Sequence, residues 1–113
     1  YFNSGATGHQ IKLASVGTGN PLAYTDLVWN GSNQLTDADM TFNTSYSWST
    51  SPTLGTYDVR NVATHEFGHW LKLNDLTTSV DTEKTMYYGI LMHETKKRSL
   101  ETDDLNGINA VYP

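Results

Sequence analysis

Residues 65–75 read HEFGHWLKLND, and the rest of the chain is best interpreted outward from this stretch. We predict a helix over residues 59–71, because apolar residues recur there at helical spacing and Asp58 precedes them as a suitable N-cap. On such a helix His65 and His69 lie one turn apart on the same face. Two imidazoles placed in this way can bind one Zn²⁺ ion at roughly 2.0–2.1 Å.

Glu66 lies next to the first of these histidines, which completes the pattern H-E-x-x-H. It is poorly placed to bind the same ion, but it can reach a water molecule bound to that ion. A carboxylate there can take a proton from the water and return it to a leaving amine. The simpler alternative is a surface helix that carries two histidines and a solvated glutamate.

A third protein ligand is expected, since catalytic zinc sites usually combine three protein ligands with one water. Asp75 follows His69 by six residues. A helix that continued past His69 would carry Asp75 away from the ion, whereas a chain that leaves the helix near Lys72 can bring it back. Taken alone, Asp75 would be an ordinary turn residue, but its position after H-E-x-x-H favours a metal ligand.

Length and composition restrict the class of protein. The chain has 113 residues, 37% of them hydrophobic and 17% charged, so we expect one folded domain over 1–113. Cysteine is absent, which excludes disulfides and thiolate metal sites. A net charge of −5 with only seven basic residues does not suit nucleic-acid binding. No apolar run is long enough to cross a membrane, and the first ten residues do not resemble a signal peptide.

The flanking segments predict an α+β fold. The predicted strands cover 10–16, 23–29 and 37–43. The last of them, DADMTFN, alternates: Ala38, Met40 and Phe42 share one face, and we expect the other face to be wet. Residues 44–57 read as a surface loop and 74–99 as irregular chain. A final helix is predicted over 103–111, capped by Thr102. Strands and helices in separate blocks are typical of α+β proteins.

Several other features have simpler interpretations. The run Lys96–Arg98 holds three of the seven basic residues and reads as a solvated loop. Asn43 begins an N-x-S/T glycosylation pattern, which is frequent by chance. His9 and His93 are isolated, and we expect both on the surface.

HEFGHWLKLND resembles the zinc signature of the metzincin metalloproteases, H-E-x-x-H-x-x-G-x-x-H/D, with the final Asp that snapalysin-like proteases carry. TMYYG (85–89) resembles the Met-turn of these enzymes, with Met86 preferred over Met92 as the buried methionine. SLETDDLNGINAVYP (99–113) resembles the last helix of the matrixins, the family of the matrix metalloproteinases. DADMTFN looks like the edge strand above their cleft. The resemblance covers 37–113, whereas residues 1–36 match poorly.

Three departures from the family pattern stand out. Lys72 takes the place of a glycine that normally lets the helix end in a left-handed turn. Only 64 residues precede the motif, and the family's long first helix is not recognisable among them, so the domain is expected to be shortened at its N-terminus. The paired residues of a second, structural zinc site are also not recognisable.

The resemblance implies a secreted, monomeric, zinc-dependent endopeptidase that acts on an extended peptide or protein. The implied fold is a small twisted mixed β-sheet with an active-site helix, a Met-turn and a C-terminal helix. His65, His69 and Asp75 would bind zinc, Glu66 would act as general base and acid, and Tyr88 would either donate to the oxyanion or form a wall of the substrate pocket. Substrate would pair with the strand 38–43 by strand addition. The family often has a calcium site, to which Asp37, Asp39, Asp81 and Glu83 could contribute, but no EF-hand-like spacing of oxygen ligands is present, so calcium stays open.

Two other hypotheses remain open at this stage. In the first, the protease takes its third ligand from Glu94, 25 residues after His69, with His93 as a neighbouring candidate. The surrounding MHETKKR is a poor match for the second helix that such a site requires. In the second, the domain binds zinc and a protein partner but has no activity. Metal analysis combined with a cleavage assay on casein separates these hypotheses.

Overall fold

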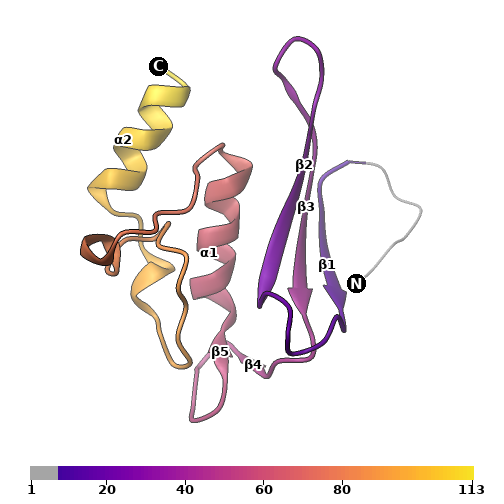
Figure 1. Ribbon diagram of the computed structural model, residues 1–113, viewed down its shortest axis with the longest axis vertical. Helices are drawn as coiled ribbons and strands as arrows, with labels where there is room; N and C mark the ends of the chain where they lie inside the picture. Colours follow the sequence, from indigo (N-terminus) through magenta and orange to yellow (C-terminus); the bar gives the residue numbers. More distant parts are fainter. Residues whose placement is uncertain (1–7) are drawn as a thin grey trace. The chain divides into compact units, whose positions relative to one another are not determined.

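The computed structural model describes residues 8–113, and inferences about the first seven residues lie outside it. Contacts within the chain group into two compact units, Tyr1–Tyr46 and Ser47–Pro113, which are described separately (Figure 1). The first unit contains a β-sheet, and the second contains both α-helices. The predicted α+β class is confirmed. Within the described residues, no helix is both long enough and apolar enough to cross a bilayer.

The first unit is a three-stranded mixed sheet. Its strands are β1 (Gln10–Ala14), β2 (Ala23–Trp29) and β3 (Leu35–Asn43), arranged in the order β1-β3-β2. β1 runs parallel to β3, and β2 runs antiparallel to it. All three strands were predicted, with boundaries that differ by at most two residues. β1 ends before Val16, because the Val16 N–H donates to the Asn43 side chain at 3.2 Å instead of continuing the ladder.

The position of β3 corrects one implication of the family resemblance. We expected residues 38–43 to form an edge strand, but β3 is the central strand of this sheet. Met40 pairs with Ile11 on one side and with Thr25 on the other. A substrate peptide therefore cannot add along this part of β3. The alternation of side chains predicts the two faces of a strand but not its neighbours.

The expected wet face of β3 is also largely wrong. Ala38, Met40 and Phe42 are buried as predicted, but Thr41 and Asn43 on the opposite face are buried too. The Asn43 side chain donates to the carbonyls of Gly17 and Pro21, at 2.8 and 3.1 Å. Its side-chain oxygen accepts from Val16 and from Ser45. Asn43 thus fastens two loops, and its buried amide is not available as a glycosylation acceptor in the folded chain.

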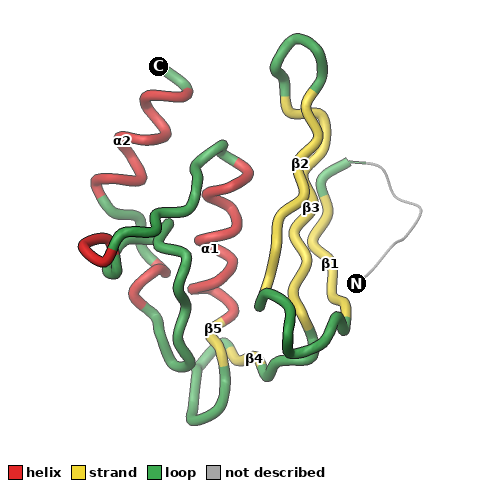
Figure 2. The backbone as a smooth tube through the Cα atoms, viewed as in Figure 1, coloured by secondary structure: helices red, strands yellow, loops and turns green. Residues whose placement is uncertain are grey.

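The second unit places two helices around irregular chain (Figure 2). Short strands β4 (Trp48–Ser49) and β5 (Tyr57–Asp58) pair in parallel and lead into α1 (Val59–Trp70). Most of the chain after α1 is loop, with 3₁₀ turns η1 (Ser79–Asp81) and η2 (Lys96–Arg98), as the prediction of irregular chain implied. The C-terminal helix is α2 (Thr102–Val111).

The helix caps match the predictions at α1 and differ at α2. Asp58 caps α1, because its carboxylate accepts from the backbone N–H groups of Arg60 and Asn61. α2 begins at Thr102, and the residue before it, Glu101, is the N-cap. Glu101 and Asp104 form a reciprocal capping box, in which the Glu101 N–H donates to Asp104 at 2.7 Å. Thr102 was therefore the wrong cap, by one residue.

The basic run Lys96–Arg98 is not a solvated loop. Lys97 is fully buried, and its ammonium group donates to the Glu94 carboxylate at 2.5 Å and to the Gly89 carbonyl at 2.8 Å. Asn61 of α1 accepts from the Lys97 backbone at 2.7 Å and donates to Glu94 at 3.1 Å. These four residues are called the Lys97 cluster below.

Candidate metal centre

α1 brings three potential metal ligands together. His65 and Glu66 are buried and His69 is half-buried. One ligand atom from each of the three lies within 4.8 Å of the other two. The helical spacing of H-E-x-x-H places the two histidines, four residues apart, on one face of α1.

The end of α1 turns the chain back towards this group. Leu71 caps the helix, and Lys72 follows it with φ +69°, in the left-handed region. The Lys72 N–H donates to the His69 carbonyl at 2.9 Å, and the Leu73 N–H donates to the Gly68 carbonyl at 3.0 Å. These two bonds form a Schellman motif, which usually has glycine in the left-handed position. The predicted break near Lys72 is present, with lysine in that position.

Asp75 lies against both imidazoles after this turn. Its Oδ1 atom is 3.1 Å from His65 Nε2 and 3.4 Å from His69 Nε2. The next residue, Leu76, is fixed by two backbone bonds: its N–H donates to the Met86 carbonyl at 2.8 Å, and its carbonyl accepts from Tyr88 at 3.1 Å. The loop that carries Asp75 is therefore held to the segment that contains Met86.

Backbone carbonyls determine which nitrogen of each histidine carries hydrogen. His65 Nδ1 lies 2.8 Å from the Thr85 carbonyl, and His69 Nδ1 lies 2.8 Å from the Leu73 carbonyl. A carbonyl only accepts, so each Nδ1 must donate. In the neutral rings, the lone pair is then on Nε2, which faces Asp75. This is the outer-shell arrangement typical of metal-binding histidines.

The donor set fits a divalent cation. In neutral rings, His65 Nε2, His69 Nε2 and Asp75 Oδ1 are all acceptors, and no proton lies between them. One protonated ring can pair with Asp75, but it leaves the other ring without a partner, and two imidazolium rings with centroids 4.9 Å apart would repel each other; a divalent cation engages all three acceptors at once. Ligands of a tetrahedral zinc ion at about 2.0–2.1 Å lie about 3.3–3.4 Å from one another, close to the separations found here.

Met86 packs beneath the histidine helix. It is buried, and a Cβ added to Gly68 would lie only 2.2 Å from its sulfur, so any larger residue at that position would force the Met86 side chain to move. Met92 is largely exposed. The structure thus agrees with the preference for Met86.

The alternative ligands are engaged elsewhere. Glu94 belongs to the Lys97 cluster. His93 Nε2 accepts from the Gly55 backbone N–H at 3.0 Å, and the His93 N–H donates to the Thr56 carbonyl at 3.1 Å. Asp75 is therefore the carboxylate that the structure brings to the two imidazoles. His9 is exposed, as expected.

Tyr88 is placed near the site in the chain, but its side chain is open to solvent. It is 58% exposed, and its ring lies 5.0 Å from that of Tyr87, centroid to centroid. Tyr88 follows Met86 by two residues. Its backbone bond to Leu76 holds it beside the loop that carries Asp75. The assignment of Tyr88 as an oxyanion donor stays a prediction.

The four calcium candidates form no metal-sized group among residues 8–113. Three of them face lysines. Asp39 pairs with Lys12, and this hydrogen bond raises the pKa of the lysine. Glu83 lies 3.0 Å from Lys96.

Asp81 is the third of these paired acids. It lies 2.8 Å from Lys84, and the hydrogen bond from Lys84 lowers the pKa of Asp81. A lysine partner occupies a carboxylate that calcium would need, so these contacts do not support the calcium expectation at Asp39, Glu83 and Asp81.

An α+β chain with a histidine pair on one helix, an aspartate returned by a left-handed turn and a buried methionine beneath belongs to the class of metzincin catalytic domains. Within that class, the family model described as Matrixin matches residues 2–113, and the chain belongs to the matrixin family. This match includes most of residues 1–36, which the motif comparison had left outside the resemblance.

Two relatives illustrate the family relationship. The chain is 38% identical to neutrophil collagenase of Homo sapiens over 74 residues. This matched stretch is 66% of this chain and 15% of that protein. It is 37% identical to metalloendoproteinase 1 of Glycine max over 76 residues. This matched stretch is 67% of this chain and 24% of that protein. The chain thus matches less than a quarter of the length of either relative.

Proposed function

We propose that the chain is the catalytic part of a zinc-dependent endopeptidase, with zinc bound by His65, His69 and Asp75. The observation that carries this proposal is the convergence of three acceptor atoms at 3.1 and 3.4 Å, with both Nδ1 atoms bound to carbonyls. Membership of the matrixin family supports it, as does the name of each relative, a collagenase and a metalloendoproteinase.

A bound zinc ion would polarise the scissile carbonyl and make water acidic enough to attack near neutral pH. The Glu66 carboxylate would accept the proton of the attacking water and then deliver it to the nitrogen of the leaving amine. Glu66 is only 5% exposed and adjoins His65 in the helix, which suits a base that acts inside the site. The Thr85 and Leu73 carbonyls would keep both histidines in the binding tautomer.

We assign a smaller role to Tyr88. Its phenol would donate a hydrogen bond to the oxygen that becomes negative in the transition state. Its exposed ring can be covered when a peptide binds, which would exclude water from that bond. A wall of the substrate site is the alternative role. Tyr88→Phe separates the two, because loss of the hydroxyl alone lowers kcat only if the phenol donates.

We propose an extended peptide or protein as the substrate, and an extracellular, monomeric protein. Strand addition to β3 along Asp39–Asn43 is excluded, since both sides of that strand are paired. A peptide that adds to this sheet must use an outer edge, on β1 or on β2. β2 is seven residues long and runs antiparallel to its neighbour β3. A peptide could pair with the other edge of β2.

The test is metal content measured together with cleavage of casein and of a mixed peptide library. We expect one zinc ion per chain, loss of cleavage with a chelator, and recovery when zinc is restored. A chain that holds one zinc ion and cleaves nothing would be an inactive binding domain. Cleavage that resists complete removal of metal would place the catalytic residues elsewhere.

A further inference from the structure

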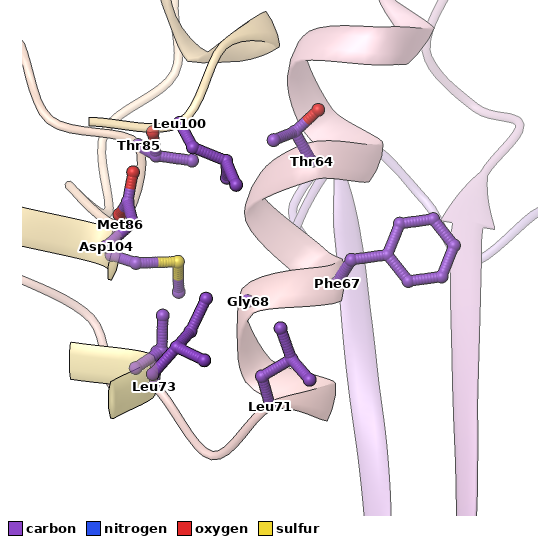
Figure 3. A pocket seen from close by; sticks show the side chains of 10 residues that line it. Thr64, Phe67, Gly68, Leu71, Leu73, Thr85, Met86, Leu100 and Asp104 are labelled. Atoms are coloured by element: carbon purple, nitrogen blue, oxygen red, sulfur yellow. The ribbon is translucent and has the colours of Figure 1, made fainter. Parts of the chain in front are cut away.

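A cavity lies behind the histidine helix, within the second unit (Figure 3). Its volume is about 240 Å³. α1 contributes Thr64, Gly68 and Leu71 to one wall, and the other wall includes Met86, Leu100 and Ile108. Figure 3 shows the Met86 sulfur turned towards Gly68. Neither histidine lines this cavity, so it is separate from the candidate metal centre.

The wall offers a ligand almost no polar partner. The Thr64 hydroxyl already donates to the Arg60 carbonyl at 2.8 Å, and the Thr85 hydroxyl donates to the Ser99 carbonyl at 3.1 Å. The Asp104 carboxylate accepts from the Glu101 N–H in the capping box of α2. No lysine, arginine or histidine contributes to the wall. An anionic ligand would find no partner there, and the one carboxylate in the wall, Asp104, is engaged in the cap of α2, so an uncharged, apolar ligand fits this lining best.

The size of the cavity suits a small ring compound. An apolar cavity of about 150 Å³ in another protein stays dry and binds benzene. At about 240 Å³, this cavity can accept one substituted benzene or a molecule of similar size.

The same wall holds both histidines in place from behind. Thr85 lines the cavity, and its carbonyl orients His65; Leu73 lines it too, and its carbonyl orients His69. Leu73 also packs against α2, because a Cβ added to Gly107 would lie only 2.9 Å from its side chain. A molecule that spreads this wall therefore shifts the groups that fix both Nδ1 atoms.

We propose that this cavity is a binding site for a small, uncharged aromatic or aliphatic molecule, and that its occupancy changes zinc affinity at the centre in front. The second half rests on the proposed function, since it needs zinc at His65 and His69. The first half does not, so binding is tested on the metal-free chain and coupling on the zinc-loaded chain. Failure of the zinc site is then distinguishable from failure of the cavity.

Binding is measured by methyl NMR of the full chain with toluene as the probe and benzoate as its charged counterpart. We expect toluene to shift the methyl signals of Met86, Leu73 and Ile108 with a dissociation constant of about 0.1–1 mM. Benzoate should shift none of them at the same concentration. Equal shifts from both compounds, or none from toluene up to its solubility, would overturn the proposal.

A pair of tryptophan variants locates the site. Leu100 lines the cavity and is half-exposed, so Leu100→Trp should fill the cavity without unfolding the chain. Leu105 has similar exposure but does not line the cavity, so Leu105→Trp is the matched control. Leu100→Trp should weaken toluene at least about tenfold, and Leu105→Trp less than twofold. Should Leu100→Trp unfold, a direct contact between toluene and the Met86 methyl in a nuclear Overhauser spectrum decides, and its absence counts against the site.

Coupling is measured by competing the protein against a zinc chelator, with and without saturating toluene. Allosteric couplings are typically about 5–150-fold, and we expect zinc affinity to change by at least about fivefold. Leu100→Trp should abolish the toluene effect. Toluene that binds while zinc affinity stays within experimental error would refute the coupling.

Discussion

Two polar clusters include residues of α1 that lie one helical turn apart. They differ in whether the cluster contains its own cation. The Lys97 cluster, which Asn61 joins to α1, contains a cation, an anion and carbonyl and amide groups that bond to both. The cluster of His65, His69 and Asp75 contains only acceptors when the rings are neutral. The first is complete within the chain, whereas the proposed zinc ion would complete the second.

The difference suggests how structural and functional clusters can be told apart. A buried charge is tolerated when it is paired and hydrogen-bonded, as Lys97 is. Three acceptors gathered at one point, two of them fixed by backbone carbonyls, gain little for the fold alone. Removing a member should therefore damage stability in the Lys97 cluster and activity or metal binding in the histidine cluster.

The largest effect is expected for Glu66→Gln. Loss of a general base typically lowers the rate by about 10²–10⁴-fold, and the amide is nearly isosteric, so zinc should stay bound. Peptide cleavage and zinc content are measured on the same sample. Glu83→Gln is the control, because Glu83 is an exposed carboxylate outside the group of metal ligands. Activity of Glu66→Gln within threefold of the wild type would remove Glu66 from the mechanism.

Lys97→Met tests the complete cluster. Removing one partner of a buried ion pair typically costs about 3–5 kcal/mol, because the other charge stays buried. Urea unfolding should show this loss, and Lys97→Met combined with Glu94→Gln should recover part of it. Lys96→Met is the matched control: its pair with Glu83 is exposed, so less than about 1 kcal/mol should be lost. Equal losses for the two lysines would contradict the comparison.

Asp75→Ala tests the incomplete cluster. Loss of a supporting outer-shell group already costs about 10–100-fold in metal affinity, so loss of a ligand should cost at least that much. Asp75→His should keep zinc bound, since imidazole binds zinc at a similar distance. Affinity is measured by competition with a chelator, while stability of the metal-free chain should hardly change. Full zinc occupancy in Asp75→Ala would assign the third position to another group.

Local patterns were sufficient to predict much of this fold. The period of apolar residues predicted α1 to within one residue, and the N-cap Asp58 was identified correctly. β2 coincides with the predicted strand. The break at Lys72 followed from the requirement that Asp75 return to the histidines, and the backbone there is left-handed. In each case, the residues that decide the structure lie within a few positions of one another.

The failures concern partners distant in sequence. Burial of Lys97 depends on Gly89 and on Asn61, 36 residues away, so the sequence KKR alone looked solvated. The central position of β3 depends on β1, which pairs from 29 residues upstream and leaves no mark on the alternation within β3. A loop-binding role for Asn43 could have been suspected from its place at the end of a strand, but its partners could not be named.

The smallest expected effect belongs to Lys72→Gly. Lys72 has φ +69°, where a side chain with a Cβ is strained by about 1–2 kcal/mol, and glycine is not. Glycine also makes the unfolded chain more flexible, which cancels part of the gain. We expect a net stabilisation of a few tenths to about 1 kcal/mol, with unchanged cleavage.

Asn33→Gly is the matched control, because Asn33 has φ +58° and asparagine tolerates this region. Its gain should be smaller. The two variants are compared by urea unfolding with and without zinc. If the gain at Lys72 is larger with zinc bound than in the metal-free chain, coordination of the metal by Asp75 holds the strained turn in place. If Lys72→Gly is less stable in both states, contacts of the lysine side chain outweigh its strain, and the turn does not depend on the metal centre.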